Sequence, residues 1–457
     1  MTRYRRRVAA DLEQWIRQGW VEARHRQAIL DSLGPGGGGW SAAGASAILG
    51  AILLGLAALS FVAANWDALP RLARFALIIG ALWGAFGGAA RAFASGHPGL
   101  GHALAMLGVL LFGAGIVLTA QTFNMAAFRN TGVLIWTIGA AVAASVVVSR
   151  PTAVLAALLG LLWLWLEYVN PFAPEPLWGY LALWALTGAL ASHLGSRVAW
   201  QVLSLGLLVW IGASLWRLTE ANQLAEFEQA CAFVIIVTTL AVAATMVYER
   251  GLLGAGSLAR WAATVAVLTG ASLQFPLTGL DGAVSSDDPG GYDASALALL
   301  GGDGTLYWLL SLGSATGLAA LLTLRVVGGR LPLVAAATLA ASALLIVLLP
   351  AILRWSGPEL LIAIRLVFGA AVYALATALI ALGSDEARRY LGGLGVLLFC
   401  LQSIYVYTVL FGTLLDTALF FFVGGFLLIG LSMLLVRTQR ALTKAQPQPA
   451  REGDPNA

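Results

Sequence analysis

The length, composition and charge of this chain of 457 residues restrict its class. Hydrophobic residues make up 60% of it, charged residues only 11%, and the mean hydropathy is +0.85. A soluble domain carries about 25% charged residues, so the composition excludes an ordinary soluble protein and predicts a polytopic membrane protein. The 26 basic and 22 acidic residues nearly balance, and no basic segment rich in aromatic residues occurs, which argues against nucleic-acid binding.

The chain begins with a polar segment that is too hydrophilic to enter a membrane. Residues 1–33 predict a small cytoplasmic helical hairpin, because Leu12 and Ile16 share one helix face and a second apolar face begins at Ile29. The Gly-rich residues 34–40 follow and predict a flexible linker.

Residues 41–436 predict a transmembrane domain. A membrane-spanning helix needs roughly 20 mostly apolar residues. We therefore expect an all-α fold with about 14 transmembrane helices. The sixth candidate is short and the last two nearly touch, so the expected range is 12–14. The expected spans are 41–64, 71–93, 101–121, 131–148, 152–168, 177–193, 198–218, 229–248, 258–276, 305–324, 331–353, 359–382, 389–410 and 413–436. The tail 437–457 is expected to be disordered and cytoplasmic.

The distribution of basic residues predicts how the chain is threaded. With the N-terminus inside, 20 basic residues fall on the cytoplasmic side and six on the other, or within a span. Because Lys and Arg near span ends are retained in the cytoplasm, both termini are predicted to be cytoplasmic. The long acidic loop 277–304 is then external.

No sequence motif indicates an enzyme, a metal or a cofactor. The GGDGT at 301–305 resembles a nucleotide-binding signature of lipid kinases, but it lies in the acidic external loop without an α/β domain. His97 and His102 share a loop without a metal-ligand pattern. Cys231 and Cys400 lie within apolar runs and are expected to be buried thiols. We therefore assign no catalytic residue, cofactor or metal.

Polar residues gather at the predicted external ends of the spans. Intramembrane polar groups are costly and indicate function by default. The residues of this kind are Asn65, Asp67, Gln121, Asn124, Glu167, Asn170, Gln274, Arg365, Gln402, Tyr405, Tyr407 and Asp416. We expect Asn65 and Asp67 to share an external polar cavity with Gln121, Asn124 and Arg365. The alternative is interfacial anchoring and helix capping, with Asp67 pairing locally with Arg71.

Three segments of the N-terminal third resemble a known family. They are DLEQWIRQGWVEARHRQAIL, FVAANWDALPRLARF after the first span, and AQTFNM at the end of the third. They resemble the bacterial "domain of unknown function 2157" family of predicted membrane proteins, over about the first 150 residues, the size of a domain. The resemblance implies a multi-pass protein of the bacterial plasma (inner) membrane and implies no activity.

Three classes of function fit this sequence. The first is a transporter- or flippase-like protein with an external polar cavity, because many glycines permit close helix packing and helix breaks. The second is a structural or sensory membrane protein that binds a cytoplasmic partner through residues 1–33. The third is a membrane enzyme acting on a lipid-linked substrate. The lipid bilayer is the expected partner in all three.

Overall fold

The computed structural model describes residues 3–32, 70–123, 130–173, 177–221, 224–277, 304–355, 361–384 and 388–410, together with scattered positions between 46 and 61. Every regular element among these residues is a helix. The helices are α1 Arg3–Arg17, η1 Ala23–His25, α2 Arg26–Ser32, α4 Arg71–Ala94, α5 Pro98–Thr122, α6 Thr131–Val147, α7 Arg150–Tyr168, α8 Trp178–His193, α9 Arg197–Glu220, α10 Glu226–Glu249, α11 Ala255–Ser272, α14 Thr305–Val327, α15 Leu333–Trp355, α16 Leu361–Leu382 and α17 Arg389–Leu410.

The helices from α4 to α17 lie on twelve of the stretches expected to span the membrane. In the part of the chain that the structure describes, nine of them are long and apolar enough to do so. The exceptions are α6 and α8, with 17 and 16 residues, and α11, which carries Arg260 within its 18 residues. The stretch 413–436 lies outside the described residues and 41–64 largely so, and the total of 14 therefore stays a prediction.

Two compact units divide the chain, residues 1–159 and residues 160–457. The boundary between them falls within α7. In the first unit, α1 and α2 pack against each other, with Leu12 and Leu30 buried between exposed polar faces. The hairpin, linker and tail boundaries expected from the sequence stay predictions.

Glycines of α5 receive aromatic side chains from the helices on either side. A Cβ on Gly108 would lie 2.8 Å from the ring of Phe86 in α4, and one on Gly113 would fall within the indole of Trp136 in α6. The Trp136 Nε1 donates to the carbonyl oxygen of Val109 at 2.8 Å. Small residues thus let three apolar helices approach closely without a polar core.

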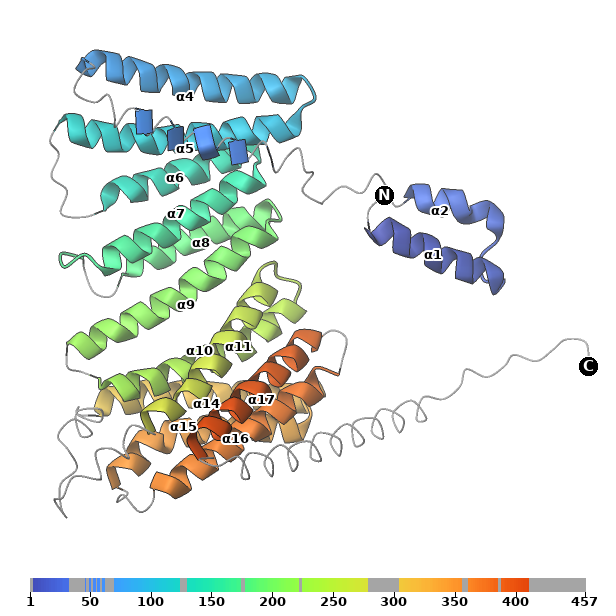
Figure 1. Ribbon diagram of the computed structural model, residues 1–457, viewed down its shortest axis with the longest axis vertical. Helices are drawn as coiled ribbons and strands as arrows, with labels where there is room; N and C mark the ends of the chain where they lie inside the picture. Colours follow the sequence, from blue (N-terminus) through green and yellow to red (C-terminus); the bar gives the residue numbers. More distant parts are fainter. Residues whose placement is uncertain are drawn as a thin grey trace, which may run out of the picture. The chain divides into compact units, whose positions relative to one another are not determined.

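Six helices of the second unit form a closed ring. In order around it, each helix contacts the next: α10, α14, α15, α16, α17, α11 and then α10 again, and α10 also contacts α15. Figure 1 labels these six helices. The ring brings α11 beside α17, although the residues that join them, Gln274 and Gln402, are 128 positions apart in the sequence. This closure, which the order of helices along the chain does not reveal, creates the space described below.

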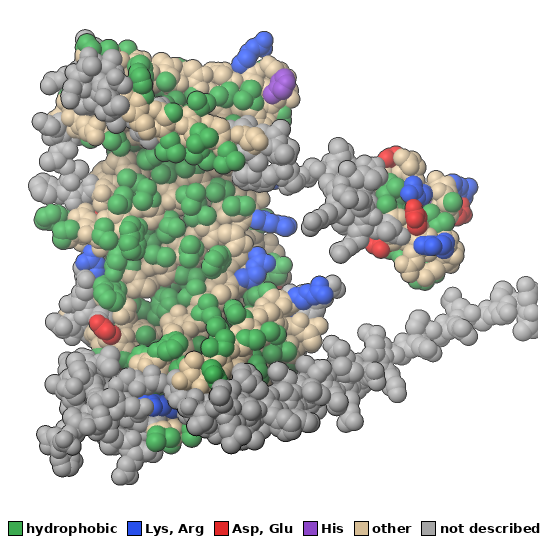
Figure 2. All heavy atoms as spheres, in the orientation of Figure 1, with side chains coloured by type: hydrophobic (Ala, Val, Ile, Leu, Met, Phe, Trp, Pro, Cys, Tyr) green, Lys and Arg blue, Asp and Glu red, His purple; other side chains and the backbone are tan. Residues whose placement is uncertain are grey.

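Large apolar side chains remain exposed on both units. Trp83, Val146 and Val334 are 74%, 76% and 77% exposed. On the face that Figure 2 shows, hydrophobic side chains cover the lengths of the helices, and charged side chains lie near helix ends. Soluble monomers rarely expose contiguous apolar surface on this scale, so lipid is the solvent of these helices. The chain is a multi-pass membrane protein with several apolar helices.

The two cysteines differ in environment, which corrects the expectation that both are buried. Cys231 on α10 is buried, whereas Cys400 on α17 is exposed. Leu398 and Gln402, two residues before and after Cys400, are both buried. Two residues turn an α-helix by about half a circle, so Cys400 lies on the opposite face of α17, away from the ring.

Candidate functional site

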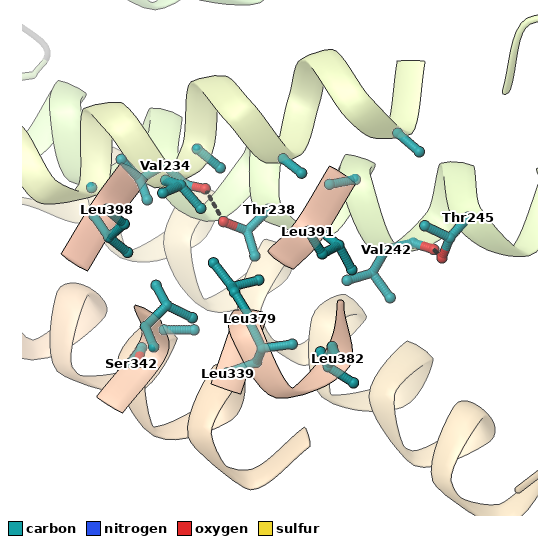
Figure 3. A pocket seen from close by; sticks show the side chains of 18 of the residues that line it. Val234, Thr238, Val242, Thr245, Leu339, Ser342, Leu379, Leu382, Leu391 and Leu398 are labelled. Carbon is teal, nitrogen blue, oxygen red and sulfur yellow. Dashed lines mark hydrogen bonds between the residues drawn. The ribbon is translucent and has the colours of Figure 1, made fainter. Parts of the chain in front are cut away.

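The six helices of the ring line a partly open cavity of about 370 Å³. Small-molecule sites in proteins typically measure roughly 300–1,000 Å³. Most of the wall is apolar, and Figure 3 shows leucines of three helices lying across the space from α10. These leucines are Leu339 of α15, Leu379 and Leu382 of α16, and Leu391 and Leu398 of α17.

The cavity exists because α11 turns its smallest residues toward it. They recur every three or four positions, which places them on one helix face. Apart from Arg260, no side chain on this face is larger than valine, so α11 leaves space that its neighbours do not fill. The lining residues of α11 are Gly256, Ala259, Arg260, Ala263, Ala266, Val267, Gly270 and Ala271.

Helix α10 contributes threonines whose hydroxyl protons are already used. Thr238 Oγ1 donates to the carbonyl oxygen of Val234 at 2.7 Å, and Thr245 Oγ1 donates to that of Val242 at 2.7 Å. Both bonds are drawn in Figure 3. Because Ser and Thr hydroxyls in helices commonly bond back to the preceding turn, these residues add little free donor capacity to the wall.

The cavity is long and narrow. Its lining runs along α10 from Val234 to Glu249 and along α11 from Gly256 to Ala271. Fifteen residues of helix rise about 22 Å. The hydrocarbon core of a bilayer is about 30 Å thick. A volume of about 370 Å³ spread over such a length suits an extended chain better than a compact ligand.

Charged side chains gather at the end of the cavity where α10 and α14 finish. Arg325 Nη2 lies 2.8 Å from Glu249 Oε1, and Arg325 Nη1 donates to Thr245 Oγ1 at 3.0 Å. Arg330 Nη1 lies 2.8 Å from the other carboxylate oxygen, Oε2. The Arg325 side chain is only 7% exposed. Glu249 therefore neutralises a guanidinium that would be costly to bury alone.

Two more arginines line the same end. Arg260 and Arg388 lie with Arg325 within electrostatic range of the Tyr390 phenol. Arg388 Nη2 donates to the carbonyl oxygen of Arg330 at 2.7 Å. The guanidinium of Arg260 makes no hydrogen bond or ion pair with any residue that the structure describes. Among the described residues, this end of the cavity therefore carries more positive than negative charge.

Amides close the opposite end, one turn beyond the lining residues Ala271 and Leu398. The side chains of Gln274, two residues after the end of α11, and Gln402 on α17 each donate Nε2 to the other's Oε1 at 2.8 Å. Gln274 Nε2 also contacts the carbonyl oxygen of Ala271 at 2.9 Å, and Tyr405 Oη donates to that of Gln274 at 3.3 Å. These two buried amides satisfy each other without adding charge.

The residues predicted to form an external polar cavity are only partly described. Asn65, Asp67 and Asn124 lie outside the described residues. Gln121 is exposed in the last turn of α5, in the first unit. Arg365 on α16, in the second unit, donates Nε to the carbonyl oxygen of Leu277 at 2.9 Å. That predicted cavity stays a prediction.

Sequence reasoning missed the charged residues of the six-helix cavity. Glu249, Arg260, Arg325 and Arg388 entered it only as loop charges that set the orientation. One signal was available, since Gly and Ala recur along one face of α11 with a single arginine among them. This pattern predicts close packing or open space beside that helix. It does not predict which helices lie opposite.

Residues 13–153 match the model of a family described as "Predicted membrane protein (DUF2157)". The match covers the N-terminal third and confirms the resemblance carried by its three segments. No curated protein and no solved structure matches the chain. The six-helix cavity lies beyond the matched residues, so its function is argued from its own side chains.

Proposed function

We propose that this membrane protein is transporter- or flippase-like and holds the apolar chain of an amphiphile in its six-helix cavity. The observation that supports this is a long apolar cavity with polar side chains at both ends. Arginines stand at one end, and the Gln274–Gln402 pair stands at the other. Sites of this kind use apolar walls for contact and a few polar groups for orientation.

The form of the cavity favours an amphiphile over the other classes of solute. A water-soluble solute would need polar groups along its whole path, and the wall between the two ends is lined mainly by Leu, Val and Ala. A purely apolar compound would leave the arginine end without a role. An amphiphile matches both features, because its chain fits the wall and its headgroup fits either polar end.

The predicted topology gives the cavity a direction. Glu249, Arg260 and Arg388 belong to sequence segments expected on the cytoplasmic side, which places the amide end toward the outside. We propose that the headgroup meets the arginines from the cytoplasmic leaflet and leaves past Gln274 and Gln402. This route does not use the predicted external cavity around Asn65 and Asp67.

Occupancy is tested by photocrosslinking in phosphatidylcholine nanodiscs. A diazirine-bearing hexadecanol should label peptides of α10, α11 and α17. The substitution Ala263→Phe fills the space beside α11 and should abolish this labelling. Leu268→Phe is the matched control, because Leu268 is on the same helix, 39% exposed and not part of the lining. Equal labelling of the two variants would contradict occupancy of the cavity.

Movement is tested separately in proteoliposomes. Fluorescent lipids carrying a nitrobenzoxadiazole group in the inner leaflet are protected from external dithionite until they cross the bilayer. The protein and its Leu268→Phe variant should accelerate the loss of fluorescence, and Ala263→Phe should not. If the protein does not accelerate the loss of fluorescence over protein-free vesicles, for lipids of any headgroup, the transport proposal is wrong. The proposal that the cavity binds an amphiphile would still stand.

A second role is favoured by the N-terminal helices. Trp15 and Trp20 are 39% and 73% exposed on a segment expected to be cytoplasmic. Exposed aromatic residues are typical anchors of protein interfaces. We propose that residues 1–33 bind a cytoplasmic partner. A pulldown that compares the full chain with its Trp15→Ser/Trp20→Ser variant tests this. If both chains retain the same proteins, the proposal is contradicted.

A further inference from the structure

We infer that the amphiphile bound in the six-helix cavity carries an anionic phosphate or carboxylate headgroup, held at the arginine end by Arg260. This inference rests on the proposed function, because it assigns the ligand class of the same cavity. Two observations support it: the charged side chains that line the cavity, and the hydrogen bonds and ion pairs that these side chains make in the structure.

The apolar wall cannot select a ligand by itself. Lipid tails are as apolar as leucine side chains, so moving a hydrocarbon chain from the bilayer into the cavity gains little free energy. The chain explains the shape of the site, and selectivity must come from the headgroup. The side chains at the arginine end therefore decide which amphiphile is preferred.

The lining charges of this end favour an anion. Arg260, Arg325 and Arg388 line the cavity, against Glu249 as the lining acid among the described residues. Glu249 already holds Arg325 and Arg330, each at 2.8 Å. A second anion would thus meet Arg260, in a part of the lining that also holds Tyr390 and Arg388, whose Nη2 already donates to the carbonyl oxygen of Arg330. Guanidinium groups present paired donors that match phosphate and carboxylate oxygens.

Arg260 is the informative member of this set. It is the sixth residue of α11, about 7.5 Å from the helix start at 1.5 Å per residue. Its side chain is exposed, as a long basic side chain near a helix end can be, and within the described residues no side chain pairs with it. A ligand anion supplies that partner. Asp385 and Glu386 lie outside the described residues, so the test uses the full chain with their charges included.

A headgroup series separates charge from chain. The full protein in phosphatidylcholine nanodiscs is labelled with the photoreactive hexadecanol in the presence of competitors. These are hexadecyl phosphate, hexadecanoate, hexadecanol, hexadecylamine and inorganic phosphate. Hexadecyl phosphate and hexadecanoate should compete about tenfold better than hexadecanol, since hydrogen bonds between charged groups are stronger than those to a neutral hydroxyl. Hexadecylamine should compete worse than hexadecanol. Inorganic phosphate should not compete, because it lacks the chain.

Variants of the arginine end assign the preference to named residues. Arg260→Gln should bring the phosphate and alcohol to equal affinity, while Arg260→Lys should keep most of the preference. Arg250→Gln is the matched control, because Arg250 is exposed and lies outside the cavity lining. The preference should also weaken as salt is raised, since the arginine end is partly open to water.

The outcomes distinguish this inference from the proposed function. Equal competition by phosphate, alcohol and amine would overturn the anionic headgroup while leaving a chain-binding cavity. A tenfold preference that survives in Arg260→Gln would overturn the assignment to Arg260. Failure of every long-chain compound to displace the photoprobe would instead remove the cavity as a lipid site, and with it the proposed function.

Discussion

Gln274 and Gln402 form a reciprocal amide pair, in which each side chain donates to and accepts from the other at 2.8 Å. Both residues are buried, 4% and 2% exposed. A reciprocal pair fixes the orientation of both amides and joins α11 to α17 at one end of the cavity. Neither residue has this partner until the ring closes.

Removing one member of this pair should be worse than removing both. Gln402→Leu leaves the Gln274 amide buried with fewer partners and should lower the free energy of unfolding by about 1–2 kcal/mol. The double variant Gln274→Leu/Gln402→Leu should be closer to the parent protein than Gln402→Leu alone. Unfolding in mixed detergent micelles measures both, with exposed Gln121→Leu as the control. A double variant that shows the sum of two large losses would contradict the pairing.

The carboxylate of Glu249 should matter far more to stability than its exposed partner Arg330. Glu249→Gln leaves Arg325 buried without an anion and should cost about 2 kcal/mol, less than for a fully buried pair because the Glu249 side chain is 30% exposed. Arg330→Gln removes a side chain that is 58% exposed and should stay within about 1 kcal/mol. Thermal unfolding of matched preparations ranks them, and an equal loss from both substitutions would refute this account.

The glycine at position 113 should not tolerate a methyl group. Gly113→Ala would place Cβ within the indole of Trp136, which is held by its bond to Val109, and should cost about 1–3 kcal/mol of stability. Gly84→Ala is the control, because a Cβ there meets nothing within 4 Å. It should be neutral, or stabilise the helix by up to about 1 kcal/mol. The melting temperatures of the two variants test this. A lower melting temperature for Gly84→Ala than for Gly113→Ala would contradict the packing of Trp136 against Gly113.

Both termini are predicted to be cytoplasmic and the loop 277–304 external. In a background with Cys231 and Cys400 replaced, Asp288→Cys should react with an impermeant thiol reagent on intact cells. Gln446→Cys in the tail should react only after permeabilisation. The asymmetry of basic residues is the physical reason for this orientation. Labelling of Asp288→Cys only after permeabilisation would invert the topology and move the arginine end of the cavity to the outside.

Hydropathy located the helices well, because entry into lipid depends on the residues of one segment at a time. For α10 the expected span 229–248 lies within the observed Glu226–Glu249, and for α17 the two agree at 389–410. Even the short helix α6 lies where the apolar run predicted it. The sequence alone therefore predicted where each helix lies in the chain and at which end of the helix its charged residues fall.

The partners of those charges depended on packing between distant segments. Arg325 and Glu249 are 76 positions apart, and no local pattern relates them. Their pairing follows from the contact between α10 and α14, which is a property of the closed ring. The polar residues predicted at the external ends of the spans have partners of two kinds. Gln274, Gln402 and Tyr405 meet one another, while Arg365 binds the backbone at Leu277.

The closed ring also sets an order of events during synthesis. Helix α11 cannot meet α17 until the 128 residues between Gln274 and Gln402 have been made, which takes roughly 6 to 26 s at about 5–20 residues per second. During that interval the glycine and alanine face of α11 has no α17 beside it, and the Gln274 amide lacks its partner. A ribosome stalled before α17 should therefore leave a nascent chain that is inserted in the membrane and open to any protein or lipid able to cover α11.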